Sequence, residues 1–206
     1  MLVFDLLAMF VFAAAGGLTA VRLNLDIVGV VVLGMTTGMG GGVVRDLLVG
    51  ASPPAALVDW RYLTALVAGG LLTFFFHPAV GRLQSTINVL DAFGLGLFSV
   101  TGTLKAEHYH LPMLACALVG VVSGVGGGIL RDVLIGRIPT ILRRGELYAI
   151  PAAAGAALLV IGVRLHADST LMLIVAASVA TGWRLLALRN GWQAPLPYGN
   201  ATDPDD

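Results

Sequence analysis

The chain has 206 residues, of which 57% are hydrophobic and 12% are charged, and its mean hydropathy is +0.90. Ordinary soluble domains carry roughly 25% charged residues, so this composition indicates a polytopic membrane protein. The formal net charge is +0 and the 12 Lys and Arg residues are scattered, which leaves no basic surface for a nucleic acid. The sequence has no Walker loop, HExxH motif or Ser/His/Asp order, so we expect no enzyme.

Residues that bind metals or form disulfides are equally sparse. Cys116 is the single cysteine of the chain and lies in an apolar stretch, so an intrachain disulfide is excluded. His108 and His110 share one short turn without further ligands of the usual kind. We therefore expect neither a metal site nor a cofactor.

Apolar stretches divide the chain into predicted transmembrane helices, for which a bilayer core of about 30 Å needs roughly 20 residues. The sequence predicts an all-α protein with seven such spans, over residues 2–21, 27–49, 62–76 (or from 60), 89–106, 112–135, 147–163 and 170–188. Gly50 is a plausible end of the second span, because glycine commonly caps helix C-termini. Residues 190–206 hold three Pro and three late Asp without an apolar period, which is typical of a disordered tail.

A thirteen-residue motif occurs twice, over residues 34–46 and 120–132, at an offset of 86 positions. Its copies read Gly-Met-Thr-Thr-Gly-Met-Gly-Gly-Gly-Val-Val-Arg-Asp and Gly-Val-Val-Ser-Gly-Val-Gly-Gly-Gly-Ile-Leu-Arg-Asp. Other residues recur at the same offset, among them Asp5 with Asp91 and Phe12 with Phe98. The pattern predicts a three-helix repeat over 1–87, a second over 88–166 and a seventh helix over 167–189. Because three is odd, the second repeat is inverted in the membrane.

The charged loops predict an orientation. If the N-terminus is outside, the inner loops and C-terminal flank hold Arg22, Arg82, Arg137, Arg143, Arg144, Arg184 and Arg189, and the outer loops hold Arg61, Lys105 and Arg164. Cytoplasmic loops carry the excess of basic residues. We therefore expect an outer N-terminus, a cytoplasmic C-terminus and a location in the cell inner (plasma) membrane.

The triple glycines predict breaks in the second and fifth helices. Each glycine costs about 1 kcal/mol relative to alanine within a helix. Irregular backbone in a membrane is tolerated where it is buried in protein or lines a wet cavity. Carbonyl oxygens there could replace part of a cation's hydration shell. The candidate pathway therefore comprises Gly40, Gly41, Gly42, Gly126, Gly127 and Gly128, with hydroxyls from Thr36, Thr37 and Ser123.

A second interpretation of the glycines stays open. Gly34, Gly38 and Gly42 are spaced by four, as are Gly120, Gly124 and Gly128, so each set forms a stripe without side chains on one helix face. Such stripes are typical of close helix packing.

Each motif ends in an arginine and an aspartate, Arg45 with Asp46 and Arg131 with Asp132. Charges inside a membrane are expensive and mark a functional site by default. These four residues either line the pathway or form ion pairs that lock the halves together. Neighbours in a helix do not face each other, so the expected partners lie on other helices, with Asp5 and Asp91 as candidates. The alternative for Asp5 and Asp91 is that they only complement the positive N-termini of their own helices. Lys105 either extends its ammonium group to the membrane interface or gates or repels ions in the pathway.

The doubled Gly-Gly-Gly-x-x-Arg-Asp, in a chain of three plus three plus one helices, resembles the bacterial branch of the trimeric intracellular cation (TRIC) channel family. Members of that branch are often called glycine-transporter-like domain proteins, and the resemblance covers about residues 2–188. It implies a homotrimer in which each protomer holds its own pore, lined by the second and fifth helices. It also implies conduction of monovalent cations, chiefly K⁺, with Na⁺ as a second candidate. The Lys-Glu-Val motif of animal members is matched only loosely, by Lys105-Ala106-Glu107.

Two functions remain open on the residues alone. A channel needs a continuous wet path that binds ions weakly enough to release them. A secondary transporter of a small solute such as glycine needs an occluded midplane site, where Arg45 or Arg131 would bind a carboxylate. The resemblance favours the channel.

The predicted orientation can be tested by labelling. A reporter fused after Asp206 should be cytoplasmic, and a cysteine placed at Ser52 should react with an impermeant thiol reagent from outside. Both results are expected because the loops rich in arginine lie on the cytoplasmic side, opposite to the loop that holds Ser52. Reaction at position 52 from the cytoplasmic side alone would reverse the orientation.

Overall fold

The computed structural model describes residues 1–79, 82–143 and 147–194 of the chain. Most of the predicted disordered tail, residues 190–206, lies outside the described residues.

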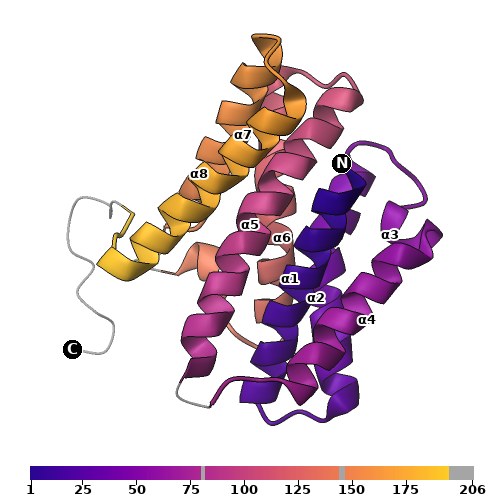
Figure 1. The fold of residues 1–206 in the computed structure, drawn as a ribbon, viewed down its shortest axis with the longest axis vertical. Coiled ribbons are helices and arrows are strands. Elements are labelled where there is room, and N and C mark those ends of the chain that lie inside the picture. The colour runs from indigo at the N-terminus through magenta and orange to yellow at the C-terminus, as the bar shows by residue number, and fades with distance from the viewer. Residues whose placement is uncertain (80–81, 144–146, 195–206) are drawn as a thin grey trace.

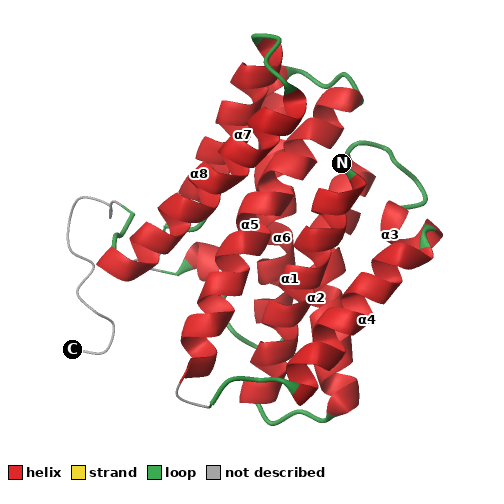
Figure 2. Cartoon of the chain, viewed as in Figure 1, coloured by secondary structure: helices red, strands yellow, loops and turns green. Residues whose placement is uncertain are grey.

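The described residues form helices and contain no strand (Figure 2). In chain order these are α1 (Leu2–Arg22), α2 (Ile27–Leu48), α3 (Ala55–Val58), α4 (Trp60–Phe75), α5 (Leu83–His108), α6 (Met113–Leu134), the 3₁₀ turn η2 (Thr140–Leu142), α7 (Ala149–Arg164) and α8 (Ser169–Asn190). A helix stands at each of the seven predicted spans, and α3 and η2 are short additions. Within the described residues, five helices are long and apolar enough to cross a membrane, whereas α4 and α7 are shorter apolar helices.

The helices form one bundle in which α5 and α6 lie between α1, α2 and α4 on one side and α7 and α8 on the other (Figure 1). The two halves meet where α1 packs against α5 and α2 packs against α6. These contacts join helices that correspond at the 86-residue offset. The arrangement therefore places the two copies of the motif, on α2 and α6, against each other in the middle of the bundle.

Side chains and glycines at the helix ends explain where the helices begin and stop. Asp26 accepts a hydrogen bond from the backbone N–H of Gly29 at 2.8 Å and caps α2, and Asp168 caps α8 through Leu171 N–H at 2.7 Å. Gly50 and Gly136 follow α2 and α6 with φ of 75° and 68°, a left-handed conformation that glycine adopts without a Cβ penalty. The predicted stop at Gly50 is thus confirmed.

The helix α5 begins six residues earlier than predicted, at Leu83 rather than at position 89. Its first turn is polar on one side, where Gln84 donates to the Asn88 side chain at 2.7 Å and accepts from Arg22. The opposite side buries Leu83 against α1. A hydropathy pattern misses this amphipathic turn, because the polar residues lower the mean.

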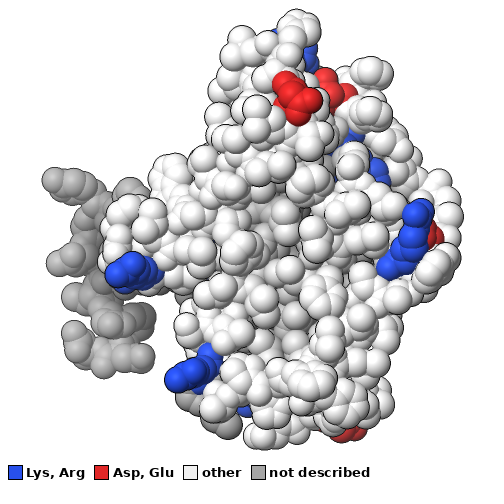
Figure 3. All heavy atoms as spheres, in the orientation of Figure 1, with Lys and Arg blue, Asp and Glu red and all other residues white. Residues whose placement is uncertain are grey.

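The surface of the bundle is apolar, as a membrane requires. The face shown in Figure 3 is almost free of charged side chains, which gather near its edges. Large apolar side chains such as Val28, Leu114 and Ile161 are exposed on α2, α6 and α7. Exposed apolar area on this scale is rare in soluble monomers and marks contact with lipid or protein.

The predicted breaks at the triple glycines are not confirmed, because α2 and α6 are helical throughout residues 40–42 and 126–128. The two helices cross at these glycines with their backbones in contact. A Cβ on Gly41 would overlap the carbonyl oxygen of Ser123, and a Cβ on Gly127 would overlap that of Thr37. Packing of one backbone against the other therefore offsets the low helix propensity of glycine.

This crossing predicts that Gly41→Ala and Gly127→Ala each destabilise the protein. The added methyl meets a backbone carbonyl that cannot rotate away, and overpacking of this kind costs about 1–3 kcal/mol. Thermal unfolding in detergent measures the effect. Gly182→Ala is the matched control, because Gly182 lies within α8 with nothing within 4 Å of an added Cβ. Unchanged unfolding temperatures for both crossing variants would refute the packing role.

Candidate functional site

The first of two buried ion clusters, here the first cluster, joins Asp5, Arg45, Asp46 and Lys105 from α1, α2 and α5. Arg45 donates from Nη1 to Asp5 Oδ1 at 2.7 Å and from Nε to Asp46 Oδ1 at 2.8 Å. Lys105 Nζ reaches the same Asp46 oxygen at 2.7 Å. The other Asp46 oxygen accepts from the backbone N–H of Ala55 at 2.9 Å. Arg45 is 0% exposed, so Asp5 and Asp46 replace water at its Nη1 and Nε atoms, whereas its Nη2 atom has no hydrogen-bond partner among the described residues.

The second cluster joins Asp91, Arg131, Asp132 and Thr140 from α5, α6 and η2. Arg131 donates to Asp91 at 2.7 Å and to Asp132 at 3.0 Å, with the same atoms that Arg45 uses. The second oxygen of Asp132 accepts from both the backbone N–H and the hydroxyl of Thr140, at 2.7 and 2.8 Å. The two clusters therefore repeat one geometry at the 86-residue offset.

The expected pairing of each arginine with an aspartate on another helix is confirmed, through Asp5 and Asp91. The expectation that neighbours in the helix would not pair is wrong. Arg45 bonds to Asp46, and Arg131 to Asp132, because the long arginine side chain folds back beside its own helix. Each arginine is thereby held at two points.

A difference between the clusters follows from proline chemistry. The residue at the Thr140 offset in the first half is Pro54, which has no backbone N–H. Asp46 therefore takes the N–H of the next residue, Ala55, at the start of α3. In both halves the carboxylate of the motif thus accepts a hydrogen bond from the backbone N–H at the start of the short helix that follows.

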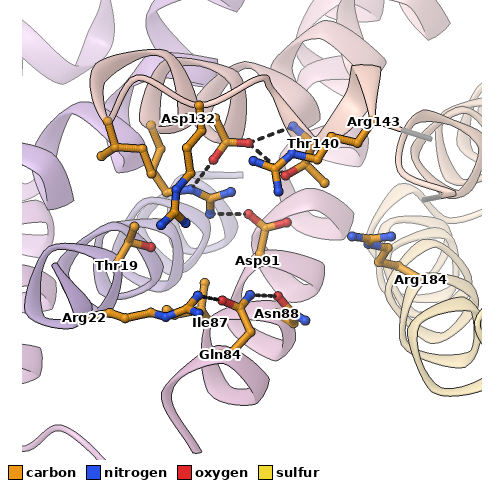
Figure 4. A pocket seen from close by; sticks show the side chains of 13 residues that line it. Thr19, Arg22, Gln84, Ile87, Asn88, Asp91, Asp132, Thr140, Arg143 and Arg184 are labelled. Atoms are coloured by element: carbon orange, nitrogen blue, oxygen red, sulfur yellow. Dashed lines mark hydrogen bonds and ion pairs between the residues drawn. The ribbon is translucent and has the colours of Figure 1, made fainter. Parts of the chain in front are cut away.

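Two cavities open beside the clusters. The arginine cavity has a volume of about 320 Å³ and is shown in Figure 4. Its lining comprises Thr19, Arg22, Gln84, Ile87, Asn88, Asp91, Arg131, Asp132, Ile135, Arg137, Thr140, Arg143 and Arg184. The Lys105 cavity, of about 350 Å³, is lined by Ala51, Pro53, Ala55, Val58, Asp59, Tyr62, Lys105 and Tyr109. Asp59 stays ionised there, because the hydrogen bond from the Arg61 side chain lowers its pKa.

The cavities lie at opposite ends of the bundle. Asp5 of the first cluster is in the first turn of α1, whereas Thr19 of the arginine cavity is near its end. Fourteen residues of helix separate them, which is roughly 20 Å along the axis. The duplicated halves thus present one cluster and one cavity toward each face.

The middle of the bundle, between the two clusters, is closed. Phe12 and Phe98, which correspond at the offset, stack there with ring centroids 5.5 Å apart. Thr37 and Ser123 are fully buried at the crossing of α2 and α6, whereas Thr36 is partly exposed and donates to Val32 O at 2.9 Å. A Cβ on Gly126 would lie 3.0 Å from the Cα of Gly41.

The remaining motif glycines accommodate side chains of other helices. A Cβ on Gly40 would press on Leu130 of α6, and one on Gly42 would lie 3.0 Å from the methyl carbon of Met9. Gly128 leaves space for the hydroxyl of Tyr148. All six predicted glycines are therefore close-contact positions, three on each side of the crossing.

Lys105 marks the main asymmetry between the halves. Its counterpart at the offset is Thr19, whose hydroxyl bonds to its own helix at Ala15 O, 2.8 Å away. A threonine is too short to reach Asp132 as Lys105 reaches Asp46. The Lys105 cavity is therefore blocked from its cluster by an ammonium group, and the arginine cavity is not.

Three residues of the second cluster's surroundings were not among the predicted site residues: Thr140, Tyr148 and Arg184. Tyr148 carried a signal, since it corresponds to Tyr62 at the offset. Thr140 carried no such signal, because its counterpart at the offset is Pro54. Arg184 carried none either, because it lies on α8, outside the repeat.

Comparison with known proteins supports this reading of the sequence as a duplication. A family model described as "Glycine transporter" matches the chain twice, over residues 2–78 and 88–164. The chain is 50% identical over 198 residues to a UPF0126 membrane protein of Streptomyces coelicolor, covering 96% of this chain and 90% of that protein. It is 36% identical to the UPF0126 inner membrane protein YadS of Escherichia coli K12, covering 94% and 93%.

Solved structures show the same fold. A TRIC trimeric intracellular cation channel orthologue from Rhodobacter sphaeroides superimposes with a TM-score of 0.87 at 37% identity, over 92% of this chain and 97% of that one. A prokaryotic TRIC channel crystallised in 0.5 M KCl gives a TM-score of 0.84 at 31% identity, over 91% and 95%. A duplicated helical bundle with a buried Arg-Asp cluster in each half thus defines an integral membrane protein of TRIC fold. The chain belongs to the bacterial branch of the TRIC family.

The ion clusters predict a large stability difference between buried and exposed pairs. Asp5→Ala and Asp91→Ala each leave a buried guanidinium short of one carboxylate, and removing one partner of a buried pair costs about 3–5 kcal/mol. Arg61→Gln removes an exposed ion pair with Asp59 and should leave stability unchanged. Thermal unfolding in detergent compares the three variants. Equal stability of Asp5→Ala and Arg61→Gln would show that the first cluster does not support the fold.

Proposed function

We propose that the protein is a channel for monovalent cations, permeable to K⁺ and secondarily to Na⁺. Each protomer of a homotrimer would hold its own pore, lined by α2 and α6. The structures that this chain resembles are described as TRIC cation channels, which supports conduction, and as trimeric, which supports the assembly. The observation in this chain that carries the proposal is the pair of cavities at opposite ends of one bundle, each of which reaches an ion cluster, one at Asp91, Arg131 and Asp132 and the other at Lys105.

The path would run from one cavity to the other through the crossing of α2 and α6. Main-chain carbonyls of Thr37 and Ser123 and the hydroxyl of Ser123 face this crossing or its flank. Such oxygens can replace water around a cation. With the helices in backbone contact and Phe12 stacked on Phe98, the described state is closed. Opening requires the two helices to separate at Gly41 and Gly127.

Lys105 supplies a second closure in this proposal. Its ammonium occupies Asp46 Oδ1, an acceptor that a permeating cation would otherwise contact. The ammonium also repels cations from the mouth of the Lys105 cavity. Withdrawal of Lys105 would uncover one carboxylate oxygen and remove one positive charge from the path.

The membrane arrangement of the proposal has seven spans, with α4 and α7 added to the five long helices. Their 16 residues reach roughly 24 Å, somewhat less than a bilayer core of about 30 Å. Short spans can be accommodated by local thinning of the bilayer. With the N-terminus outside, the arginine cavity faces the cytoplasm and Lys105 faces the exterior. The location is the inner membrane, as for the relative YadS.

A secondary transporter of a small solute such as glycine is the alternative, and the description of the matching family model favours it. The closed middle between two cavities would suit alternating access. The geometry of the arginines argues against it, because Arg45 and Arg131 already hold carboxylates of the protein at 2.7 Å. A substrate carboxylate would have to displace Asp5 or Asp91.

Purified protein in a planar bilayer should give discrete unitary currents. In a KCl gradient their reversal potential should lie near that of K⁺, because carbonyl and hydroxyl oxygens of Thr37 and Ser123 border the crossing at the centre of the path. Uptake of radiolabelled glycine into liposomes is the companion assay. Saturable glycine uptake without unitary currents would overturn the channel and establish the transporter.

The variant Lys105→Gln tests whether the current flows along the path beside Lys105. Loss of the ammonium should raise open probability or conductance severalfold, whereas Arg164→Gln, an exposed change at the end of α7, should leave both as in the unmodified protein. Identical currents from Lys105→Gln and the unmodified protein would place the pore elsewhere.

A further inference from the structure

The arginine cavity holds more positive than negative charge. Both of its aspartates, Asp91 and Asp132, bond to Arg131 of the second cluster. The lining includes three further arginines that form no ion pair with any residue that the structure describes, namely Arg22, Arg137 and Arg143. These four arginines and two aspartates leave an excess of two positive charges. The excess does not depend on Arg184, which already bonds to the backbone of Leu147 and packs on the Tyr148 ring.

The hydrogen bonds that hold two of these arginines go to neutral groups, which leave the charge in place. Arg22 donates to the side-chain oxygen of Gln84. Arg143 donates from Nε to the backbone oxygen of Ile138 at 2.8 Å. Figure 4 shows Arg22 and Arg143 on different sides of Asp91, so positive groups line the cavity from more than one side.

The charges of the Lys105 cavity, at the other end of the bundle, are paired. Its lining contains one ammonium, of Lys105, and one carboxylate, of Asp59. Lys105 bonds to Asp46 at 2.7 Å, and Asp59 bonds to Arg61 at 2.6 Å. The two cavities therefore differ in electrostatic potential although the two halves share one fold.

Substitutions at equivalent positions of the repeat produce this difference. Arg137 corresponds to Ala51 at the offset, and Arg143 corresponds to Leu57. The backbone N–H of Arg137 donates to the backbone oxygen of Asp132 at 2.8 Å, as that of Ala51 donates to Asp46. Arg137 and Ala51 line the two cavities from one backbone position, so the second half has gained a charge at a point where the first half has a methyl group.

We propose that the arginine cavity is a positively charged vestibule that admits anions more readily than cations, and that Arg22, Arg137 and Arg143 thereby make cation flow directional. Walls of low dielectric constant focus the field of the charges that line a cleft, and one kT of potential changes the local cation concentration roughly threefold. Cations therefore reach the pore less often from the arginine cavity than from the Lys105 cavity. The inference rests on the proposed channel, in which oxygens at the crossing select the cation and the vestibule sets its supply from one side.

Currents in symmetrical KCl of about 0.1 M measure the asymmetry. At equal and opposite voltages, the cation current that enters from the Lys105 cavity should exceed the opposite current roughly threefold. Arg22→Gln and Arg137→Ala should each reduce this current ratio, and the double variant should remove the asymmetry. Arg137→Lys keeps the charge and should keep the ratio. Arg189→Gln is the matched control, because Arg189 is exposed near the end of α8 and does not line the cavity.

A charge placed in the other cavity provides the converse test. Ala51→Arg introduces a guanidinium into the Lys105 cavity at the position that Arg137 has in the arginine cavity. It should lower the current that enters there and so reduce the asymmetry, whereas the neutral Ala51→Gln should not. A current ratio that both Ala51→Arg and Arg137→Ala leave unchanged would overturn the proposal.

Thiol reagents report the potential of the vestibule without any current. In a Cys116→Ala background, Asn88→Cys places the only thiol of the chain in the arginine cavity, and Val58→Cys places it in the Lys105 cavity. The rate with an anionic methanethiosulfonate divided by the rate with a cationic one cancels differences in the reactivity of the thiol itself. This rate ratio should be several-fold higher at position 88 than at position 58, and Arg137→Ala should lower it at position 88. The difference should shrink in about 1 M KCl, where the Debye length is about 3 Å.

The two readouts separate the vestibule from the channel. A rate ratio that falls in Arg137→Ala, in a protein that carries no current, would support the positive vestibule and reject the channel. Unitary currents in a protein whose current ratio and rate ratio are both unaffected by Arg22→Gln/Arg137→Ala would reject the vestibule and leave the channel standing.

Discussion

A guanidinium that is fully enclosed in a membrane bundle dictates much of the surrounding structure. Arg45 is 0% exposed, so its charge must be met by carboxylates, and those carboxylates need donors of their own. Asp5 brings α1 to α2, Asp46 recruits the start of α3, and Lys105 brings α5. One buried arginine thereby determines the relative positions of four helices. The second cluster joins α5, α6 and η2 around Arg131.

The second constraint is the close approach of the halves. Lipid is as apolar as a leucine side chain, so helices in a membrane associate through tight packing and polar contacts instead of through hydrophobic burial. The glycines at the crossing of α2 and α6 remove every side chain that would separate the backbones. In the proposed channel, the same feature that gives a close contact would leave few atoms to move for α2 and α6 to separate. A closed bundle and an openable path are compatible for this reason.

Duplication supplied two equal halves, and individual substitutions made them unequal. Thr19 and Lys105 occupy one position of the repeat, and Pro54 and Thr140 occupy another. Each difference changes what an aspartate of the motif can bind. The addition of α8 then gives the second half a contact that the first does not have, through Arg184 and Tyr148. Function at the two ends of the bundle can therefore diverge although the fold is symmetric.

The sequence by itself determined the class of protein, the helix at each of the seven positions, the duplication and the interhelical partners of the two arginines, Asp5 and Asp91, but not the pairing of each arginine with the next residue. Hydropathy, glycine stops and a repeated motif are local or periodic signals, and Asp5 and Asp91 were identifiable because they recur at one offset. Only the tertiary structure decided whether α2 and α6 are broken or continuous at the triple glycines. Helix propensity favours a break there, and only contact with the carbonyls of Ser123 and Thr37 makes a continuous helix more stable. Arg184 also required the structure, because a residue outside the repeat has no counterpart in the sequence, and its partner lies 36 positions away on another helix.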